Sequence, residues 1–357
     1  MNVRLVTTWD TACGIAEHSA MLKEAVEATD RSIHITPDPE ALDPARFFAN
    51  FDWVFNVPEI LHLNYHVALH SRWTPELIAS AQVRGLKVIV TYHDTIGEVS
   101  PMDLRDRGDT RLNRLEELAL VADALVVHEP CEGLGDEGED YYYWRMGVPG
   151  PESPVQFGHR RLPEQRAWQP IYGDAGYCFR HWVTQPVLGS IGLPFPWKNF
   201  DVLATVTRKL GWALVLLAPG ATDAQAAEWR ALNPDSYIRQ DFVPRHEAVA
   251  FLSACDATAF PYTCANTAQS AAILQGIAAR KPVIATAGCR QFRALFADPL
   301  GRTAITWIEG LDDLAFTLSH FIRIERVSPA IAALAEQDSW TKLGRKYATL
   351  YQEVSRA

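Results

Sequence analysis

Short apolar runs alternate with segments of helical spacing along most of the chain. Residues 87–91 and 212–218 are compact apolar runs that predict buried strands, whereas residues 17–29 carry apolar side chains at helical spacing. Parallel strands need a long crossover, which is usually a helix, so this alternation is typical of parallel sheets. The pattern therefore predicts an α/β fold built on doubly wound parallel sheets.

The same reading gives the full set of expected elements. The expected strands are residues 2–8, 33–35, 60–63, 87–91, 124–127, 186–191, 212–218, 236–242, 257–260, 282–286 and 304–308. The expected helices are residues 17–29, 74–83, 111–121, 200–210, 222–231, 247–254, 268–279, 311–322 and 340–355. Between residues 131 and 185 no period survives, which indicates a functional loop or an interdomain linker.

A chain of 357 residues is too long for one ordinary core and fits two domains. We expect the junction late in the aperiodic stretch, near residues 170–185, because the alternation restarts after it. Two doubly wound units facing each other across a cleft would place a ligand at the carboxyl ends of their strands.

Composition and charge limit the kinds of molecule and the environment that we expect for this protein. The 33 basic and 43 acidic residues give a net charge of −10, which disfavours affinity based on a phosphate backbone, although nucleic acid as an acceptor is not excluded. The six cysteines form no CxxC pair and are expected to be free thiols. Neither a secretory leader nor a membrane-spanning apolar run is recognisable, so we expect a cytoplasmic protein without a transmembrane segment.

The turn after the first strand is one candidate binding element. Gly14 would let backbone N–H groups approach an anion, and the N-terminus of the following helix would add partial positive charge. His18 and Ser19 would then lie in the first helical turn, facing the cleft. The alternative is a simple strand-to-helix turn in which the glycine serves only geometry.

Polar residues also follow two apolar strands. His93 and Asp94 end the segment KVIVTYHD, and His128 ends ALVVH. The carboxyl ends of parallel strands are where a doubly wound sheet exposes polar groups to a ligand. Ordinary loop residues would produce the same pattern, so this observation alone leaves both interpretations open.

Three further histidines, His62, His66 and His70, are spaced four apart. On a helix this spacing would align three metal ligands. However, residues 60–63 have the character of a strand, and no cysteine or carboxylate joins at ligand spacing. The sequence therefore predicts no metal site.

The second half offers two candidate anion-binding elements. In GLPFPWKN, Lys198 stands just before a helix, where an ammonium group suits a diphosphate, although an exposed lysine on a rigid turn is the alternative. After the strand that ends at Phe260, a small-residue helix is expected to begin near Asn266 or Thr267, with its free N–H groups facing an anion. A capped core helix would have the same sequence.

Taken in order, the motifs CGIAEHS, VIVTYHD, GLPFPWK, AILQGIAARKPVIAT and SWTKLGRKYATLYQEV resemble those of retaining GT-B glycosyltransferases of the family-4 type. The resemblance spans nearly the full length. It implies two Rossmann-like domains, the first comprising residues 1–175 and a C-terminal helix at 340–357 that crosses back. The second, residues 176–339, would bind the nucleotide sugar.

The resemblance also implies roles for individual residues. Gly14 would lie near the donor phosphates, His93 would contact the donor sugar, and Lys198 would neutralise the diphosphate. The remaining donor-side residues are Phe242 and Val243 at the nucleobase, together with Asn266, Thr267, Ser270 and Gln275. The expected acceptor-side residues are Glu17, His18, Asp94 and His128.

Two departures from the family pattern stand out. Leu193 replaces an arginine that commonly follows the glycine, and Thr267 and Gln275 occupy positions of two glutamates eight residues apart. The amide of Gln275 can still bind ribose hydroxyls, whereas Thr267 supplies no carboxylate. Some relatives with a serine-rich loop, like Gln269-Ser270 here, also lack these acids.

The expected activity is transfer of a sugar from a nucleoside-diphosphate sugar to an acceptor hydroxyl, with retention of configuration. No DxD motif suggests a metal, and the donor is a co-substrate, so no cofactor is expected. The alternatives are a nucleotide-sugar-binding or regulatory protein that has lost catalysis, a nucleotide-sugar epimerase, and an oxidoreductase, for which GxGxxG is missing. The acceptor class stays open: residues 141–144 could line a sugar, polyketide, lipid or base site, or be core.

Overall fold

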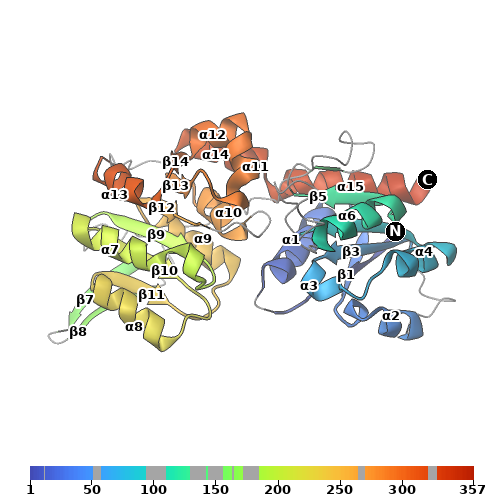
Figure 1. The fold of residues 1–357 in the computed structure, drawn as a ribbon, viewed down its shortest axis with the longest axis horizontal. Coiled ribbons are helices and arrows are strands. Elements are labelled where there is room, and N and C mark those ends of the chain that lie inside the picture. The colour runs from blue at the N-terminus through green and yellow to red at the C-terminus, as the bar shows by residue number, and fades with distance from the viewer. Residues whose placement is uncertain are drawn as a thin grey trace. The chain divides into compact units, whose positions relative to one another are not determined.

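A computed structural model describes residues 1–11, 13–50, 58–93, 110–128, 142–143, 156–162, 165–171, 185–263, 270–320 and 328–357. These residues form two compact units (Figure 1). The first unit holds the described residues between 1 and 143 and the helix at 340–357, and the second holds those between 156 and 339. Asp94, Asn266 and Thr267 lie outside the described residues, as does the whole 172–184 part of the expected junction.

The first unit is a parallel sheet in the order β2-β1-β3-β4-β5-β6. Its strands are β1 (Asn2–Val6), β2 (His34–Asp38), β3 (Ile60–Tyr65), β4 (Lys87–Tyr92), β5 (Ala124–Val127) and β6 (Tyr142–Tyr143). Its helices are α1 (Gly14–Thr29), η1 (Glu40–Leu42), α2 (Pro44–Asn50), α3 (Val67–His70), α4 (Pro75–Val83), α6 (Thr110–Val121) and α15 (Trp340–Arg356).

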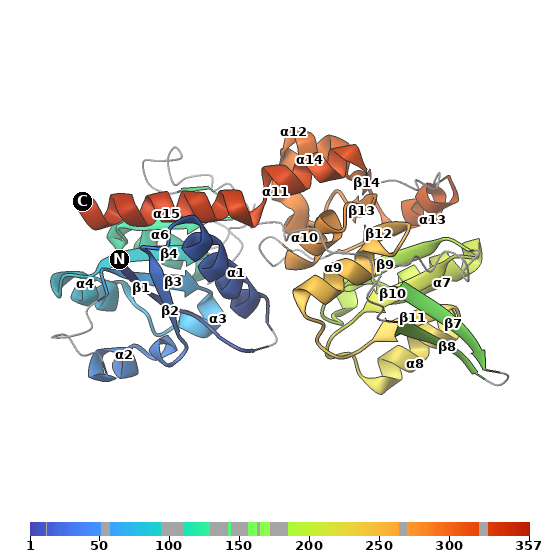
Figure 2. The same cartoon turned by 180° about the vertical axis from the view of Figure 1, so that it is seen from behind.

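The sheet of the first unit is buried on both faces, which explains why its strands are continuous apolar runs. All six residues of β3 are buried; Leu61, Leu63 and Tyr65 belong to one core cluster, and Ile60 belongs to the other. Side chains of α4 and α6 complete one cluster, and side chains of α1 and α15 complete the other. The C-terminal helix is therefore part of the core of the first unit, where it lies beside α1 (Figure 2).

A buried polar network ties α15 to this sheet. The His62 ring is hydrogen-bonded through Nδ1 to the Tyr351 hydroxyl (2.7 Å) and through Nε2 to Thr91 Oγ1 (2.8 Å). Thr91 Oγ1 also lies 2.8 Å from the Tyr347 hydroxyl. Tyr347 and Tyr351 are one helical turn apart, so both hydroxyls reach the same pair of strands.

The second unit is a parallel sheet in the order β11-β10-β9-β12-β13-β14. Its strands are β9 (Val187–Ile191), β10 (Ala213–Leu217), β11 (Ser236–Arg239), β12 (Ala257–Phe260), β13 (Val283–Thr286) and β14 (Thr306–Ile308). Its helices are η3 (Pro196–Lys198), α7 (Phe200–Leu210), α8 (Asp223–Leu232), α9 (Arg245–Ser253), α10 (Ala271–Ala278), η4 (Arg290–Phe292), α11 (Arg293–Ala297), α12 (Pro299–Ala304), α13 (Leu311–Ser319) and α14 (Pro329–Gln337).

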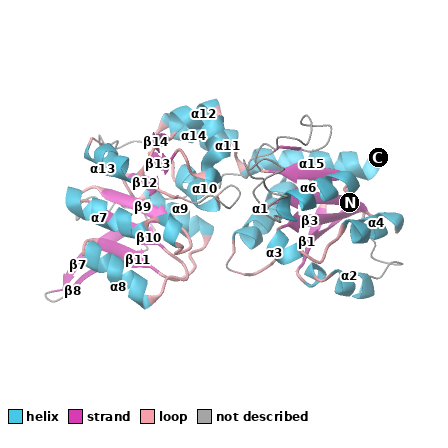
Figure 3. Cartoon of the chain, viewed as in Figure 1, coloured by secondary structure: helices cyan, strands magenta, loops and turns pink. Residues whose placement is uncertain are grey.

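In each sheet the chain adds strands first toward one edge and then, after a reversal, toward the other, while all strands stay parallel. This arrangement confirms the prediction of two doubly wound parallel sheets. Strands and helices alternate along each unit (Figure 3). The reversal falls between β1 and β3 in the first sheet and between β9 and β12 in the second. Ligands of open α/β sheets bind outside the carboxyl ends of the strands at such switch points, so these two strand ends position the candidate sites.

Some elements were not predicted. Within the stretch expected to be aperiodic, β7 (Gln156–Leu162) and β8 (Gln165–Ile171) pair as an antiparallel hairpin. The short helices α2, α3, α11 and α12 were also missed, because they contain too few turns to show a period, and α14 was missed as well. Among the helices of the described residues, none combines the length and apolarity needed to cross a bilayer.

Candidate functional site

Lys198 lies at the switch point of the second sheet, in the η3 turn that follows β9. Its side chain is buried (6% exposed), and Nζ lies 3.5 Å from the centre of the Tyr262 ring. Nζ also donates to Gln291 Oε1 at 3.4 Å. Tyr262 comes two residues after β12, so the two strands that flank the switch point hold one ammonium group between them. The alternative of an exposed lysine on a rigid turn is wrong.

Gly192 is needed for this close packing. A Cβ at Gly192 would lie 3.0 Å from the Tyr262 hydroxyl and 3.5 Å from Lys198 Cε. The Tyr262 hydroxyl donates to the Ile191 carbonyl at 2.6 Å, which fixes the ring beneath the lysine. A side chain at position 192 would therefore displace the tyrosine or the lysine.

Asn199 connects the same two strand ends through the backbone. It has left-handed dihedral angles (φ 55°, ψ 42°), which asparagine tolerates better than most residues. Its Nδ2 donates to the carbonyl of Pro261 at 2.6 Å and to that of Trp197 at 3.2 Å. Sequence reasoning missed Asn199, Tyr262 and Gln291; the asparagine directly before a helix in WKNF was the one available signal.

Helix α10 begins later than predicted. Its N-cap is Ser270 and its first residue is Ala271, not a residue near Asn266 or Thr267, and the Ser270 N–H donates to the Gln291 carbonyl at 3.4 Å. Gln275 is buried within the helix (7% exposed). A Cβ at Gly276 would meet the Phe260 ring at 2.5 Å, so the glycine lets α10 pack directly on β12.

Phe242 and Val243, expected at the nucleobase, lie in the turn between β11 and α9 of the same sheet. Phe242 is 46% exposed and Val243 is buried. Their role at a base stays a prediction. Leu193, which follows Gly192, exposes 44% of its surface and brings no charge to the turn that holds Lys198.

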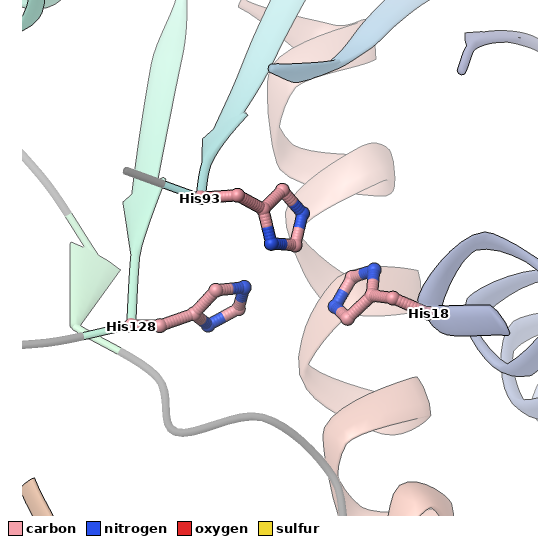
Figure 4. A group of neighbouring side chains, drawn as sticks. All are labelled: His18, His93 and His128. Carbon is pink, nitrogen blue, oxygen red and sulfur yellow. The ribbon is translucent and has the colours of Figure 1, made fainter. Parts of the chain in front are cut away.

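The first unit gathers three histidines at its own strand ends (Figure 4). His93 follows β4, His128 follows β5, and His18 projects from α1. The centroid of the His18 ring lies 4.6 Å from that of the His93 ring and 5.3 Å from that of the His128 ring. The His93 and His128 ring centroids are 4.9 Å apart. One ring nitrogen from each lies within 4.8 Å of the other two.

Asn64 of β3 determines which nitrogens carry protons. Ser19 Oγ donates to the Ile15 carbonyl, so it accepts from Thr7 Oγ1 (2.5 Å) and from Asn64 Nδ2 (2.6 Å). The amide oxygen of Asn64 then faces His93, whose Nε2–H donates to it. As a result, Nδ1 of His93 is an acceptor in the neutral ring.

Burial keeps the His18 and His93 rings neutral. Desolvation lowers the pKa of His18 well below its usual range, and the neighbouring His128 lowers it further. The pKa of His93 is also lowered well below its usual range by burial and then by His18. At neutral pH both rings therefore offer lone pairs and N–H groups and carry no positive charge.

Several residues of the first unit lie at positions other than those that the sequence predicted. His18 (2% exposed) and Ser19 (fully buried) lie in the core, one turn further along α1 than expected, because the helix begins at Gly14 and not at Glu17. Glu17 is the acidic residue of the first turn and is partly exposed. Gly14 is exposed at the helix start, where Cys13 Sγ accepts from the Ala16 N–H at 3.4 Å.

His62 and His70, two of the three histidines spaced four apart, are hydrogen-bonded to different partners. Both ring nitrogens of His62 face Thr91 and Tyr351. The His70 ring instead pairs through Nε2 with the Val6 carbonyl at 3.2 Å. The prediction of no metal site considered this trio and the missing DxD motif, and did not consider the cluster of His18, His93 and His128.

The chain matches no family model, and no curated protein matches its sequence. Solved structures with the same fold do exist. The Anabaena protein Alr3699/HepE, solved in complex with UDP and glucose, is 10% identical with a TM-score of 0.63, and the match covers 99% of this chain and 100% of that one.

Two further neighbours are named as glycosyltransferases. AviGT4, involved in avilamycin A biosynthesis, is 14% identical with a TM-score of 0.56, covering 100% of this chain and 98% of that one. WaaG, involved in lipopolysaccharide biosynthesis, is 13% identical with a TM-score of 0.54, covering 98% and 99%. The likeness over whole chains, together with the two parallel sheets, shows that this protein has the two-domain, Rossmann-like GT-B fold.

Proposed function

We propose that the protein is a glycosyltransferase that moves a sugar from a nucleoside-diphosphate sugar to an acceptor hydroxyl with retention of configuration. The observation that carries the proposal is the buried ammonium group of Lys198 at the switch point of the second sheet. A single buried cation at the carboxyl ends of parallel strands is suited to a diphosphate. The whole-chain likeness to HepE, which was solved with UDP and glucose, supports the same ligand class.

In this proposal Lys198 acts on the leaving group. Negative charge develops on the nucleoside diphosphate as the bond to the sugar breaks, and a preorganised cation stabilises that charge more in the transition state than in the ground state. Tyr262 and Gln291 hold the ammonium group in place before the donor binds. N–H groups at the start of α10 would add partial positive charge.

The remaining roles follow from the chemistry of each group. His93 is neutral, so it would orient the donor sugar through a hydrogen bond to a hydroxyl and would not act as a cation. The acceptor hydroxyl would attack on the face that the diphosphate leaves, and the leaving phosphate would take the acceptor proton. The Gln275 amide would bind ribose hydroxyls.

Three residues that depart from the family pattern favour a second function, that of a donor-binding protein without turnover. Leu193, Thr267 and Gln275 are uncharged where related enzymes commonly carry an arginine and two glutamates, so three charges that would act on the diphosphate, the donor sugar and the ribose are missing. Such a protein would bind the nucleotide sugar through Lys198 and release no product.

The experiment is to incubate the protein with UDP-, GDP-, ADP- and dTDP-sugars, and to follow thermal stabilisation and release of nucleoside diphosphate. We expect one donor class to stabilise the protein and to be slowly hydrolysed, with both effects lost in Lys198→Ala. Lys209→Ala, which removes an exposed lysine at the end of α7, is the matched control and should behave as the unmodified protein. Stabilisation without release, with or without added acceptors, would favour the binding protein. Folded protein that responds to no donor would contradict both functions.

A further inference from the structure

The histidine cluster of the first unit has the composition of a transition-metal site. Neutral imidazoles are the commonest zinc ligands, and three of them with an open fourth position is the arrangement of a reactive zinc centre. His18 and His128 are almost fully buried, at 2% and 1% exposed. The ligand nitrogens come from three elements, α1 and the ends of β4 and β5, which fixes their directions independently.

We propose that His18, His93 and His128 bind a zinc ion, or a divalent ion of similar preference, with one coordination position left for a water molecule or an anionic ligand. This site goes beyond the proposed glycosyl transfer and does not depend on it, and a bound ion would take His93 Nδ1, the nitrogen that could otherwise accept a hydrogen bond from a donor-sugar hydroxyl. Imidazole nitrogens around a tetrahedral zinc lie about 3.4 Å apart, given Zn–N distances of about 2.0–2.1 Å. The three nitrogens here lie within 4.8 Å of one another. Ring rotations that move each nitrogen by about 1 Å would bring them to the spacing that zinc requires.

The surroundings of His93 already match those of a metal ligand. Histidines that bind metals usually donate their second N–H to a carboxylate or carbonyl oxygen, which selects the tautomer and orients the ring. His93 donates its Nε2–H to Asn64 Oδ1, and the Thr7–Ser19–Asn64 chain holds that amide in the required direction. The free lone pair of His93 is therefore Nδ1, the atom available to a metal.

His18 provides a second, independent observation that points to a bound metal. Its Nε2 is buried and has no hydrogen-bond partner within the described residues, which is a costly state for a polar atom. Nδ1 of His18 lies 3.3 Å from Asn64 Nδ2, just beyond the usual hydrogen-bond range. Coordination through Nε2 would satisfy the buried nitrogen and move the ring proton to Nδ1. The long contact would then be lost, and the ring would have to turn Nδ1–H away from the Asn64 Nδ2 donor.

No carboxylate is needed to complete the set. Three neutral ligands leave the full charge of the ion, which favours a hydroxide, phosphate or carboxylate at the fourth position. Because the cluster lies at the carboxyl ends of β4 and β5, it occupies the edge of the sheet where ligands of this fold class bind.

The test is titration of the metal-free protein with Zn²⁺ by calorimetry, and with Co²⁺ by visible absorption, in the absence of any nucleotide sugar. We expect one Zn²⁺ per chain and the intense Co²⁺ absorption of a four-coordinate site. His18→Gln and His128→Gln should each weaken Zn²⁺ binding by at least about 10-fold, since even the loss of an outer-shell partner has that effect. His34→Gln, which changes an exposed histidine of β2, should bind as the unmodified protein does.

Equal Zn²⁺ affinity in His128→Gln and His34→Gln would overturn the proposal, and so would an unmodified protein that binds no Zn²⁺. If the His18 and His128 variants fail to fold, the Co²⁺ spectrum of the unmodified protein decides, because a six-coordinate spectrum would overturn the site. Donor binding does not enter these measurements, so a failed metal site leaves the proposed transferase untouched.

Discussion

The ammonium group of Lys198 lies 3.5 Å from the centre of the Tyr262 ring, so the cation rests on an aromatic face. A cation–π contact of this kind stabilises a buried charge by about 1–2 kcal/mol and does not neutralise it. In the proposed function this positive charge acts on the diphosphate of the donor.

We expect Lys198→Met to retain or increase stability while losing function. Burying a charge carries a desolvation cost, and methionine fills a similar volume with an apolar chain. Release of nucleoside diphosphate should fall by about 100- to 1,000-fold, the usual effect of removing one group that stabilises transition-state charge. Urea denaturation and a product-release assay on the same preparation measure both effects. A variant that is less stable and fully active would contradict this account.

Tyr351→Phe should destabilise the protein by about 1–3 kcal/mol, because it removes the partner of a buried nitrogen. The lost contact is the 2.7 Å hydrogen bond to His62 Nδ1. The change keeps the ring that packs on the sheet, so the effect isolates the hydroxyl. Chemical denaturation followed by circular dichroism gives the free energy of unfolding. An unchanged value would mean that the network does not hold α15 to the sheet.

Acidification should begin to destabilise the protein at a pH well above the range in which free carboxylates titrate. Burial lowers the pKa of His62 to about 3 and that of His70 to about 4, whereas both titrate near 6.5 in the unfolded chain. Between those values the unfolded state binds more protons, so stability is complete above about pH 6.5 and is lost as the pH falls toward 4. Each pKa unit corresponds to about 1.4 kcal/mol, which makes the total loss several kcal/mol.

Denaturation midpoints measured at steps between pH 7.5 and 4.5 would follow this loss. His70→Gln should lower the stability at neutral pH and flatten the pH dependence, since glutamine does not titrate. Stability that is constant across this interval would contradict the burial of neutral histidines.

Gly344→Ala should cost about 1–3 kcal/mol through overpacking. A Cβ at this position would lie 2.6 Å from the carbonyl oxygen of Ala25, so α15 and α1 could not keep their present separation. Gly288→Ala is the control, because a Cβ there meets nothing within 4 Å. Thermal denaturation of the two variants should show a lower midpoint for the first alone, and equal midpoints would rule out close contact of the helices.

The local sequence determined most of the secondary structure. Strand β12 (Ala257–Phe260) and helix α7 (Phe200–Leu210) have the bounds that their apolar patterns predicted, and the alternation of such elements was sufficient to predict two doubly wound sheets. The position of His93 and of Lys198 after an apolar strand also marked both residues, because a strand end is visible in one short segment.

Only the tertiary structure decided which strand ends meet. His18 and His128 are 110 residues apart, and their rings come together because β4 and β5 are neighbours in the sheet and α1 packs on the same edge. In the same way, Tyr262 reaches Lys198 because β12 pairs with β9 and not with β11, its predecessor in the sequence. Periodicity reports the burial of each segment, whereas strand order depends on the packing of whole faces against one another. The composition of both sites was therefore set by non-local contacts that no single segment encodes.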